Sequence, residues 1–330
     1  MRTFLIVLLV ITGMSACSKM SPPTTASISS YAQATATPNM KAWSQGERFC
    51  NFPARAFHAA YNLNEHFYVV AGRNISGSAS DIWWTIDCEN WVTASAKVDF
   101  LPREEFGNTV FNNKMWVIAG INNNKYLSDV WCSSDGVVWT TATATAGFGE
   151  RAGLSALVFN GDLIVSAGTN GKKAFNDIWS SKDGSSWTKL KEDNDKGFSQ
   201  RTGHKLLAFA GKLWVIGGKK DEQTYYSDVW SSANGIDWEI ATLNAGFTGR
   251  SDFAAITYKD RIWVIGGTGL KGVQNNEIWW TINGYSWLST TAKAEFGARS
   301  GLVATEYKNK VYLTGGMAGE KLYRDMWTSQ

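Results

Sequence analysis

Histidine, cysteine and proline are scarce in this sequence of 330 residues, which contains three His, four Cys and five Pro. Three histidines, His58, His66 and His204, are too few for a histidine-rich metal site. The H-E-x-x-H motif of zinc proteases, the Walker motif and the Rossmann fingerprint are also absent. We therefore expect no bound metal and no cofactor.

The sequence also lacks an excess of charge of either sign. It has 32 Lys and Arg against 29 Asp and Glu, a formal net charge of +3. Nucleic-acid binding needs a strongly basic face, so no nucleic-acid partner is expected. Apart from Cys17 the cysteines are Cys50, Cys88 and Cys132, an odd number that allows at most one internal disulfide. Cys88 and Cys132 hold different strand positions in neighbouring repeats, so we expect no bridge between them.

The first apolar run, residues 4–11, follows Arg2 and precedes small residues, a pattern typical of a secretory signal. It is too short for a membrane-spanning helix, which needs about 20 apolar residues. The ending Met14-Ser15-Ala16-Cys17 resembles the lipobox of bacterial lipoproteins, with Met14 in place of the usual Leu.

This resemblance implies that a signal peptide, residues 1–16, is removed and that Cys17 receives a lipid anchor with acyl chains such as palmitate. Ser18 after the cysteine implies an outer-membrane lipoprotein of the bacterial cell envelope. The alternative is an ordinary signal peptide cut after Ala16. Residues 17–41 are rich in Ser, Thr, Ala and Pro, and we expect them to form a flexible tether.

The rest of the chain repeats six times. A glycine closes an apolar run every 48 to 50 residues, at Gly72, Gly120, Gly168, Gly218, Gly267 and Gly316. A tryptophan follows 11 or 12 residues later, at Trp83, Trp131, Trp179, Trp230, Trp279 and Trp327. A second follows eight residues after the first, at Trp91, Trp139, Trp187, Trp238 and Trp287. Trp43, near the start, is the missing sixth member, because its spacing of twelve residues to the next repeated arginine matches four of the other five repeats.

Each repeat divides into four strands. In the third repeat we expect strands at about 153–160, 163–167, 176–181 and 186–190, the last two joined by the tight-turn pair Asp183-Gly184. Four strands every 48 to 50 residues predict an all-β fold, a six-bladed β-propeller of four-stranded antiparallel blades over residues 42–330. A strand at about 42–47 would complete blade 6 and close the ring. Twelve of the seventeen tryptophans belong to the two repeated positions, which predicts that they pack between blades.

At this point the sequence resembles the kelch family of β-propellers, over residues 42–330. The resemblance rests on the paired glycines, such as Gly217-Gly218, and on an aromatic residue four places before the second glycine, such as Trp214. Blades 1–3 depart from it with Ala-Gly. The hairpin 181–187 also resembles a shortened Asp-box of the sialidase type. Both relatives are propellers, so the fold expectation is the same for either.

Six arginines and six acids recur in the repeats. The arginines lie in the connections from the fourth strand of one blade to the first strand of the next: Arg55, Arg103, Arg151, Arg201, Arg250 and Arg299. The acids lie two places before the first tryptophan: Asp81, Asp129, Asp177, Asp228, Glu277 and Asp325. One interpretation is that Arg–acid pairs staple the blades together. The other, which the kelch resemblance favours, is a ligand-binding ring of guanidinium groups around the channel mouth. We favour the first, because a residue needed in every repeat is usually architectural.

Residues that break the repeat are better candidates for a ligand site. Two places after the arginine, Glu105 and Asp252 stand three blades apart and should face each other across the ring. One place further, His58 and His204 are also opposite each other. These four residues are candidate ligand-binding groups with the six arginines. We favour a structural role for the histidines and expect opposite sides of the mouth to lie too far apart for concerted acid–base catalysis.

Two functional hypotheses follow. The first is an envelope-anchored binding module, not an enzyme, that takes a protein, peptide or glycan at its arginine-rimmed face. The second is a glycan-active enzyme, similar to sialic-acid mutarotases or sialidases. The two differ in whether an acid and a base converge where the repeat is broken.

Overall fold

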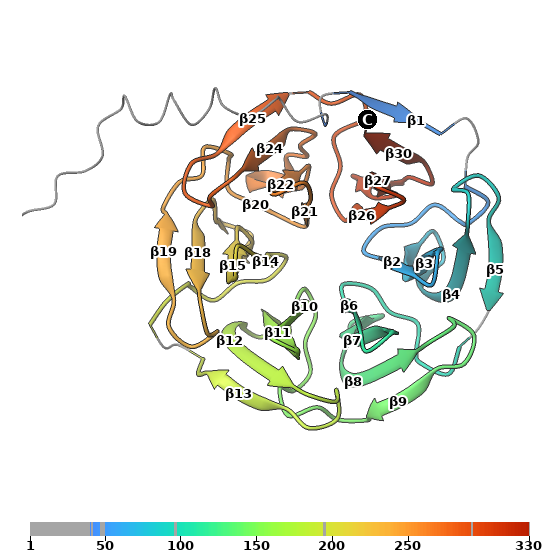
Figure 1. The fold of residues 1–330 in the computed structure, drawn as a ribbon, viewed down its shortest axis with the longest axis horizontal. Coiled ribbons are helices and arrows are strands. Elements are labelled where there is room, and N and C mark those ends of the chain that lie inside the picture. Colours follow the sequence, from blue (N-terminus) through green and yellow to red (C-terminus); the bar gives the residue numbers. More distant parts are fainter. Residues whose placement is uncertain are drawn as a thin grey trace, which may run out of the picture. The chain divides into compact units, whose positions relative to one another are not determined.

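The computed structural model describes residues 40, 42–46, 50–95, 98–193, 196–291 and 293–329. The signal peptide expected over residues 1–16, the anchor residue Cys17 and the tether other than Met40 lie outside the described residues. Residues from Met40 onward form six four-stranded antiparallel sheets arranged as a ring (Figure 1). The prediction of an all-β six-bladed propeller is confirmed.

We name the strands of each blade a to d, from the ring axis outward. Strands a to d of blades 1 to 3 are β2 (Ala59–Leu63), β3 (His66–Asn74), β4 (Gly77–Thr85), β5 (Val92–Ser95); β6 (Gly107–Phe111), β7 (Lys114–Asn122), β8 (Lys125–Ser133), β9 (Thr140–Thr143); and β10 (Ser155–Phe159), β11 (Asp162–Thr169), β12 (Ala174–Ser181), β13 (Thr188–Lys191). Those of blades 4 to 6 are β14 (Lys205–Phe209), β15 (Lys212–Ile216), β18 (Val229–Ser232), β19 (Glu239–Thr242); β21 (Ala254–Thr257), β22 (Ile262–Ile265), β24 (Ile278–Thr281), β25 (Leu288–Thr291); and β26 (Val303–Tyr307), β27 (Lys310–Thr314), β30 (Met326–Ser329), β1 (Trp43–Gln45).

The connections between strands lie on two faces of the ring, because neighbouring strands run antiparallel. The d-to-a and b-to-c connections share one face, which we call the loop face, and the a-to-b and c-to-d turns share the other, the hairpin face. On the loop face, blades 4 to 6 carry short two-stranded ribbons: β16 (Lys219–Asp221) with β17 (Thr224–Tyr225), β20 (Arg250–Ser251) with β23 (Thr268–Gly269), and β28 (Met317–Ala318) with β29 (Lys321–Leu322). A 3-10 turn, η1 (Leu270–Gly272), follows β23.

In blade 3 the strands b and c reach further onto the loop face than expected. Strand β11 ends at Thr169 and β12 begins at Ala174, whereas the sequence predicted 163–167 and 176–181. The reason is that pairing continues beyond the irregularity between Ser166 and Gly168, through Gly168–Phe175 and Thr169–Ala174. The apolar run that defines the buried part of strand b therefore marks its core and not its ends.

Strand β1 is the outermost strand of blade 6. It pairs antiparallel with β30, at Trp43 with Ser329 and Gln45 with Trp327. The indole ring of Trp43 packs edge-on against Phe296, with centroids 5.6 Å apart. The second tryptophan of the other five blades makes the same contact with its own phenylalanine, as Phe52 and Trp91 do at 4.8 Å. Met40, at the end of the expected tether, is 1% exposed and packs in the same cluster as Trp43.

Trp43 and Trp91 differ from the other second tryptophans in one respect. Their buried indole N–H groups have no hydrogen-bond partner among the described residues. In blades 2 to 5 this N–H donates to the carbonyl of the glycine in the c-to-d turn, for example from Trp187 to Gly184 over 3.0 Å. β1 is joined to no c-to-d turn, so Trp43 has no such carbonyl beside it, whereas in blade 1 Cys88 takes the place of the glycine and its carbonyl is not bonded to Trp91.

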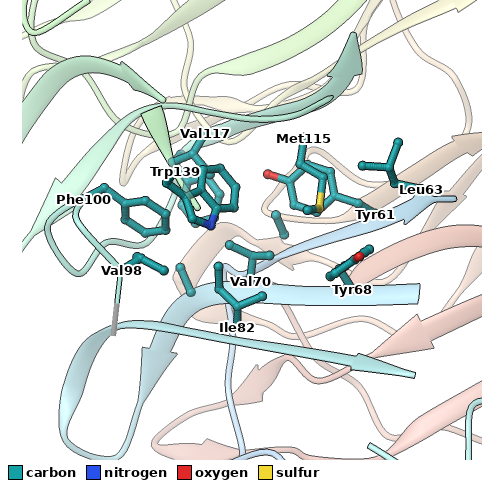
Figure 2. Close-up of a cluster of buried hydrophobic side chains, with 13 residues drawn as sticks. Tyr61, Leu63, Tyr68, Val70, Ile82, Val98, Phe100, Met115, Val117 and Trp139 are labelled. Carbon is teal, nitrogen blue, oxygen red and sulfur yellow. The ribbon is translucent and has the colours of Figure 1, made fainter. Parts of the chain in front are cut away.

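The hydrophobic core lies between the blades. The buried side chains form six clusters among the described residues, and each combines residues of two neighbouring blades. Figure 2 shows the cluster between blades 1 and 2, where Val70 and Ile82 of blade 1 meet Val117 and Trp139 of blade 2. The prediction that the repeated tryptophans pack between blades is confirmed. Cys50, Cys88 and Cys132 are all free thiols, as expected for Cys88 and Cys132.

Candidate functional site

The six repeated arginines form six ion pairs with the six repeated acids. Their N–O distances are 2.5–2.8 Å and the arginine side chains are 0–3% exposed. One guanidinium nitrogen also donates to the carbonyl of the first residue of the Ala-Gly or Gly-Gly pair, as Arg55 does to Ala71 over 2.7 Å. Burial disfavours the charged form of Asp81, yet the hydrogen bonds and charge of Arg55 keep the pKa of Asp81 below its usual value.

Each arginine joins two blades. The backbone N–H of Arg103 donates to Ala79 of blade 1, and its carbonyl accepts from Gly72 of blade 1, both over 2.9 Å. Its side chain pairs with Asp129 of blade 2. The less favoured interpretation, a ring of guanidinium groups open to a ligand, does not match this geometry. All six arginines are buried and already paired: Arg55, Arg103, Arg151, Arg201, Arg250 and Arg299. Their geometry fits the stapling role.

The two candidate histidines are also buried at blade junctions. The Nε2 atom of His58 lies 2.8 Å from the Thr314 hydroxyl of blade 6, and that of His204 lies 2.7 Å from the Ser166 hydroxyl of blade 3. Burial lowers the pKa of His58 to about 3, and it also lowers that of His204 well below its usual value. Both side chains are therefore neutral at physiological pH and act as hydrogen-bonding core residues, in line with the structural interpretation.

The residues two places after the arginines form a closed ring of backbone hydrogen bonds around the axis. Each N–H donates to the carbonyl of the equivalent residue in the preceding blade, over 2.8–3.3 Å. The donor–acceptor pairs are Phe57–Gly301, Glu105–Phe57, Gly153–Glu105, Gly203–Gly153, Asp252–Gly203 and Gly301–Asp252. All six have a left-handed backbone, with φ between 54° and 63°. We call these six residues the axial ring.

Only three residues of the axial ring carry side chains beyond glycine: Phe57, Glu105 and Asp252. The Asp252 side chain leans over Gly203, where a Cβ atom would lie 2.5 Å from the carboxylate oxygen. Phe57 leans in the same way over Gly301, with ring carbons 3.1 Å from a Cβ position there. Gly203 and Gly301 thus make room for the side chains of Asp252 and Phe57.

Glu105 and Asp252 form a coupled carboxyl pair at the channel mouth. Burial raises the pKa of Glu105 to about 8, with further increases from the charges of Asp252 and Glu104. Burial also raises the pKa of Asp252, against the lowering effects of its Ser251 hydrogen bond and of Lys219. Although the two residues come from opposite blades, the charge of Asp252 raises the pKa of Glu105.

Two lysines that the sequence analysis missed belong to this site. Lys205, at the start of β14, lies near enough to Asp252 for that carboxylate to raise its pKa against the lowering effect of burial. Lys219 of β16 pairs with Glu222 at 2.6 Å, and its charge acts on both Asp252 and Glu105. The repeat alignment could have revealed Lys205, because the equivalent residues are all small or uncharged: Ala59, Gly107, Ser155, Ala254 and Val303.

A cavity of about 360 Å³ follows the axis of the ring. Strands a of all six blades line it, together with the axial ring, and its charged lining residues are Glu105, Lys205 and Asp252. Apolar side chains such as Leu157, Leu207 and Ile256 form part of its wall. The cavity thus combines a charged region at the axial ring with a largely apolar wall along strands a.

A second cavity of about 360 Å³ lies on the loop face between blades 4 and 5. It is lined by Tyr225 of β17 and by Leu270 and Val273 around η1, both of which are exposed. The Tyr225 hydroxyl donates to Glu222 over 3.2 Å, and Glu222 is the partner of Lys219. Tyr225 and Glu222 therefore connect this groove to Lys219, whose charge acts on Asp252 at the channel mouth.

The described residues contain no group of three or more His, Cys, Asp or Glu side chains placed to hold a metal ion. Within the same part of the chain, no helix has the length and apolar character to span a membrane.

Comparison with known families places this geometry in context. A family model described as the DUF6242 beta propeller domain matches residues 159–288. A search of curated proteins found no match. A model described as the KLHDC2/KLHL20/DRC7 Kelch-repeats domain matches residues 35–207, more than half of the chain. The chain therefore belongs to this Kelch-repeats family.

Proposed function

We propose that the protein is an envelope-anchored lipoprotein whose propeller binds a protein, peptide or glycan partner at the loop face. Kelch propellers commonly serve as interaction modules, which fits a binding role. The observation that carries the proposal is the mixed-charge cluster at the channel mouth, where Glu105, Asp252, Lys205 and Lys219 break the sixfold repeat. Positions that depart from an otherwise regular scaffold are free to carry recognition.

The groove between blades 4 and 5 extends this surface. Its exposed Leu270 and Val273 and its Tyr225 provide apolar and aromatic contact area beside the charged mouth. Apolar anchors surrounded by polar groups are typical of protein-binding surfaces. The six arginines contribute to binding only indirectly, because they hold the blades that carry this surface.

The partner is tested with the full chain, purified in detergent and used as bait on a glycan array and against envelope proteins. We expect a bound glycan or protein that is lost in the double variant Glu105→Gln/Asp252→Asn. The variant Lys182→Met, an exposed lysine on the hairpin face, is the matched control and should bind like wild type. Equal binding by the double variant would show that the mouth is not the recognition site.

Anchoring through Cys17 is tested separately. Bacterial cells that express the full chain are labelled with radioactive palmitate and fractionated. We expect label in the wild-type protein and its recovery with outer membranes, and we expect the variant Cys17→Ser to lose both. Unchanged labelling of Cys17→Ser contradicts the anchor while leaving the binding proposal intact.

The second candidate is a glycan-active enzyme, favoured by one observation. A carboxyl group with a pKa raised to about 8 beside a second carboxyl group is the arrangement of a general acid and its partner. Turnover of a glycan by the wild-type protein, abolished in Glu105→Gln, would establish this function in place of simple binding. Binding without turnover supports the first proposal.

A further inference from the structure

The axial cavity begins at the charged residues of the channel mouth and continues along strands a. It extends from the axial ring along strands a, and its volume of about 360 Å³ lies at the lower end of the range of small-molecule pockets, about 300–1,000 Å³. Its wall includes half-buried apolar residues from separate blades, among them Leu157, Leu207 and Ile256. A cavity of this size admits one small molecule.

The three charged groups that line the cavity have few hydrogen-bond partners among the described residues. Among the described residues, no side chain forms a hydrogen bond with the Glu105 carboxyl group or the Lys205 ammonium group. Asp252 accepts one such bond, from the Ser251 hydroxyl over 2.8 Å. All three residues line the cavity. Polar groups that converge on a cavity and are not satisfied by protein partners are the usual mark of a ligand site.

The charges of these groups nearly cancel at neutral pH. Glu105 is largely a carboxylic acid, because its pKa is raised to about 8. The Asp252 carboxylate and the Lys205 ammonium group have opposite charges. Against the effect of burial, the Lys205 charge lowers the pKa of Asp252 and the Asp252 charge raises the pKa of Lys205. An anionic ligand would be repelled by Asp252 and a cationic one by Lys205, whereas a neutral ligand meets neither repulsion.

The hydrogen-bonding capacity of the site is mixed. A carboxylic acid donates and accepts, a carboxylate accepts from two hydroxyl groups, and an ammonium group donates up to three bonds. A hydroxyl group both donates and accepts, so several hydroxyl groups on one ligand can satisfy all three residues. The carbon-bound faces of a sugar ring can meanwhile contact Leu157, Leu207 and Ile256.

We propose that the axial cavity is a binding site for a small neutral polyhydroxylated ligand, the chemical class of simple neutral sugars, held by Glu105, Asp252 and Lys205. The proposal rests on the proposed function and deepens it, because it names the ligand class that the same mouth residues would take.

The test is calorimetric titration of the full chain with glucose, galactose, N-acetylglucosamine and maltose, with glucuronate and glucosamine as the charged counterparts. We expect at least one neutral sugar to bind, and its affinity to fall at least tenfold in Asp252→Asn and in Lys205→Met. The control Lys182→Met should bind like wild type. Thermal melting shows that each variant is folded.

Three results overturn the proposal. They are no heat of binding with any of the four neutral sugars, equal affinity of the folded variants and wild type, or tighter binding of the charged counterparts. If Lys205→Met fails to fold, Asp252→Asn alone decides the outcome. A protein partner still captured on the loop face after any of these results would leave the proposed function standing.

Discussion

The backbone N–H of Phe57 donates to the carbonyl of Gly301 over 2.8 Å, and this bond joins the first blade to the last at the ring axis. The same two blades meet again at the rim, where the blade 6 sheet takes β1 as its outer strand. The ring thus closes once at its centre and once at its circumference. The two closures involve different residues, so they can be tested one at a time.

The outer closure is tested by Trp43→Ala. Trp43 is 4% exposed and packs on Phe296, and removal of a buried Trp or Phe side chain costs about 3–5 kcal/mol. We expect the free energy of unfolding to fall by that amount, measured by chemical denaturation. The matched control is Ser44→Ala, at the exposed neighbouring position of β1. Deletion through Trp43 should likewise lower the melting temperature of the whole ring, and unchanged cooperative melting would contradict the role of β1.

The axial ring, of which the inner closure is one bond, is tested at blade 4 by Gly203→Ala. At this position φ is +63° and a Cβ atom would lie 2.5 Å from Asp252. Gly211→Ala is the matched control, because φ is +72° there and nothing lies within 4 Å. The left-handed backbone alone should cost about 1–2 kcal/mol. We expect Gly203→Ala to lose more stability than Gly211→Ala in thermal and chemical denaturation.

The excess cost at Gly203 has a specific origin, which a second variant isolates. In an Asp252→Gly background the 2.5 Å approach is gone and the Ser251 Cβ remains at 3.0 Å, so the excess cost of Gly203→Ala over Gly211→Ala should fall. An excess of unchanged size in this background would mean that Asp252 does not set the requirement for glycine.

The stapling role of the arginines is tested by Arg201→Met. The substitution leaves the Asp228 carboxylate buried without its partner, and breaking a buried pair in this way costs about 3–5 kcal/mol. Chemical denaturation should show this loss, and Arg201→Met/Asp228→Asn should recover part of it. Lys182→Met serves as the control for loss of one positive charge. A ligand-binding arginine would instead change affinity with little change in stability.

The carboxyl pair predicts a pH dependence of stability. The pKa of Glu105 is about 8 in the folded protein against an ordinary value of 4.5, so folding favours the protonated form. Its contribution is complete below pH 4.5 and is lost as the pH rises through 8. Gln does not titrate, so Glu105→Gln should gain stability relative to wild type between pH 5 and pH 9.

Denaturation at the two pH values measures this gain, with Glu89→Gln, an exposed residue of the hairpin face, as the control. The stability difference between Glu105→Gln and wild type should be larger at pH 9 than at pH 5. The same difference at both values would mean that Glu105 titrates normally in the fold.

The blades were predictable because the repeated tryptophans that mark them have one structural role, packing between blades. Trp43 could be assigned to blade 6 from its spacing alone, and it occupies that place. The arginines were ambiguous, because a guanidinium group suits a buried carboxylate and a soluble anion equally well, and only burial separates the two. The axial ring is built from N–H and C=O groups, which every residue has, so only Gly153, Gly203 and Gly301 hinted at it. Lys205 was missed because it lies one position beyond those compared between blades.

The axial ring also determines what kind of electric field the mouth can have. Each peptide group carries a dipole of about 3.5 D, and the six hydrogen-bonded groups follow one another head to tail around a circle. The components along the circle cancel by symmetry, unlike those of a helix, which add along its axis. The backbone therefore gives the mouth no in-plane polarity, and the charged side chains around it, such as Asp252 and Lys205, set the potential that an approaching molecule meets.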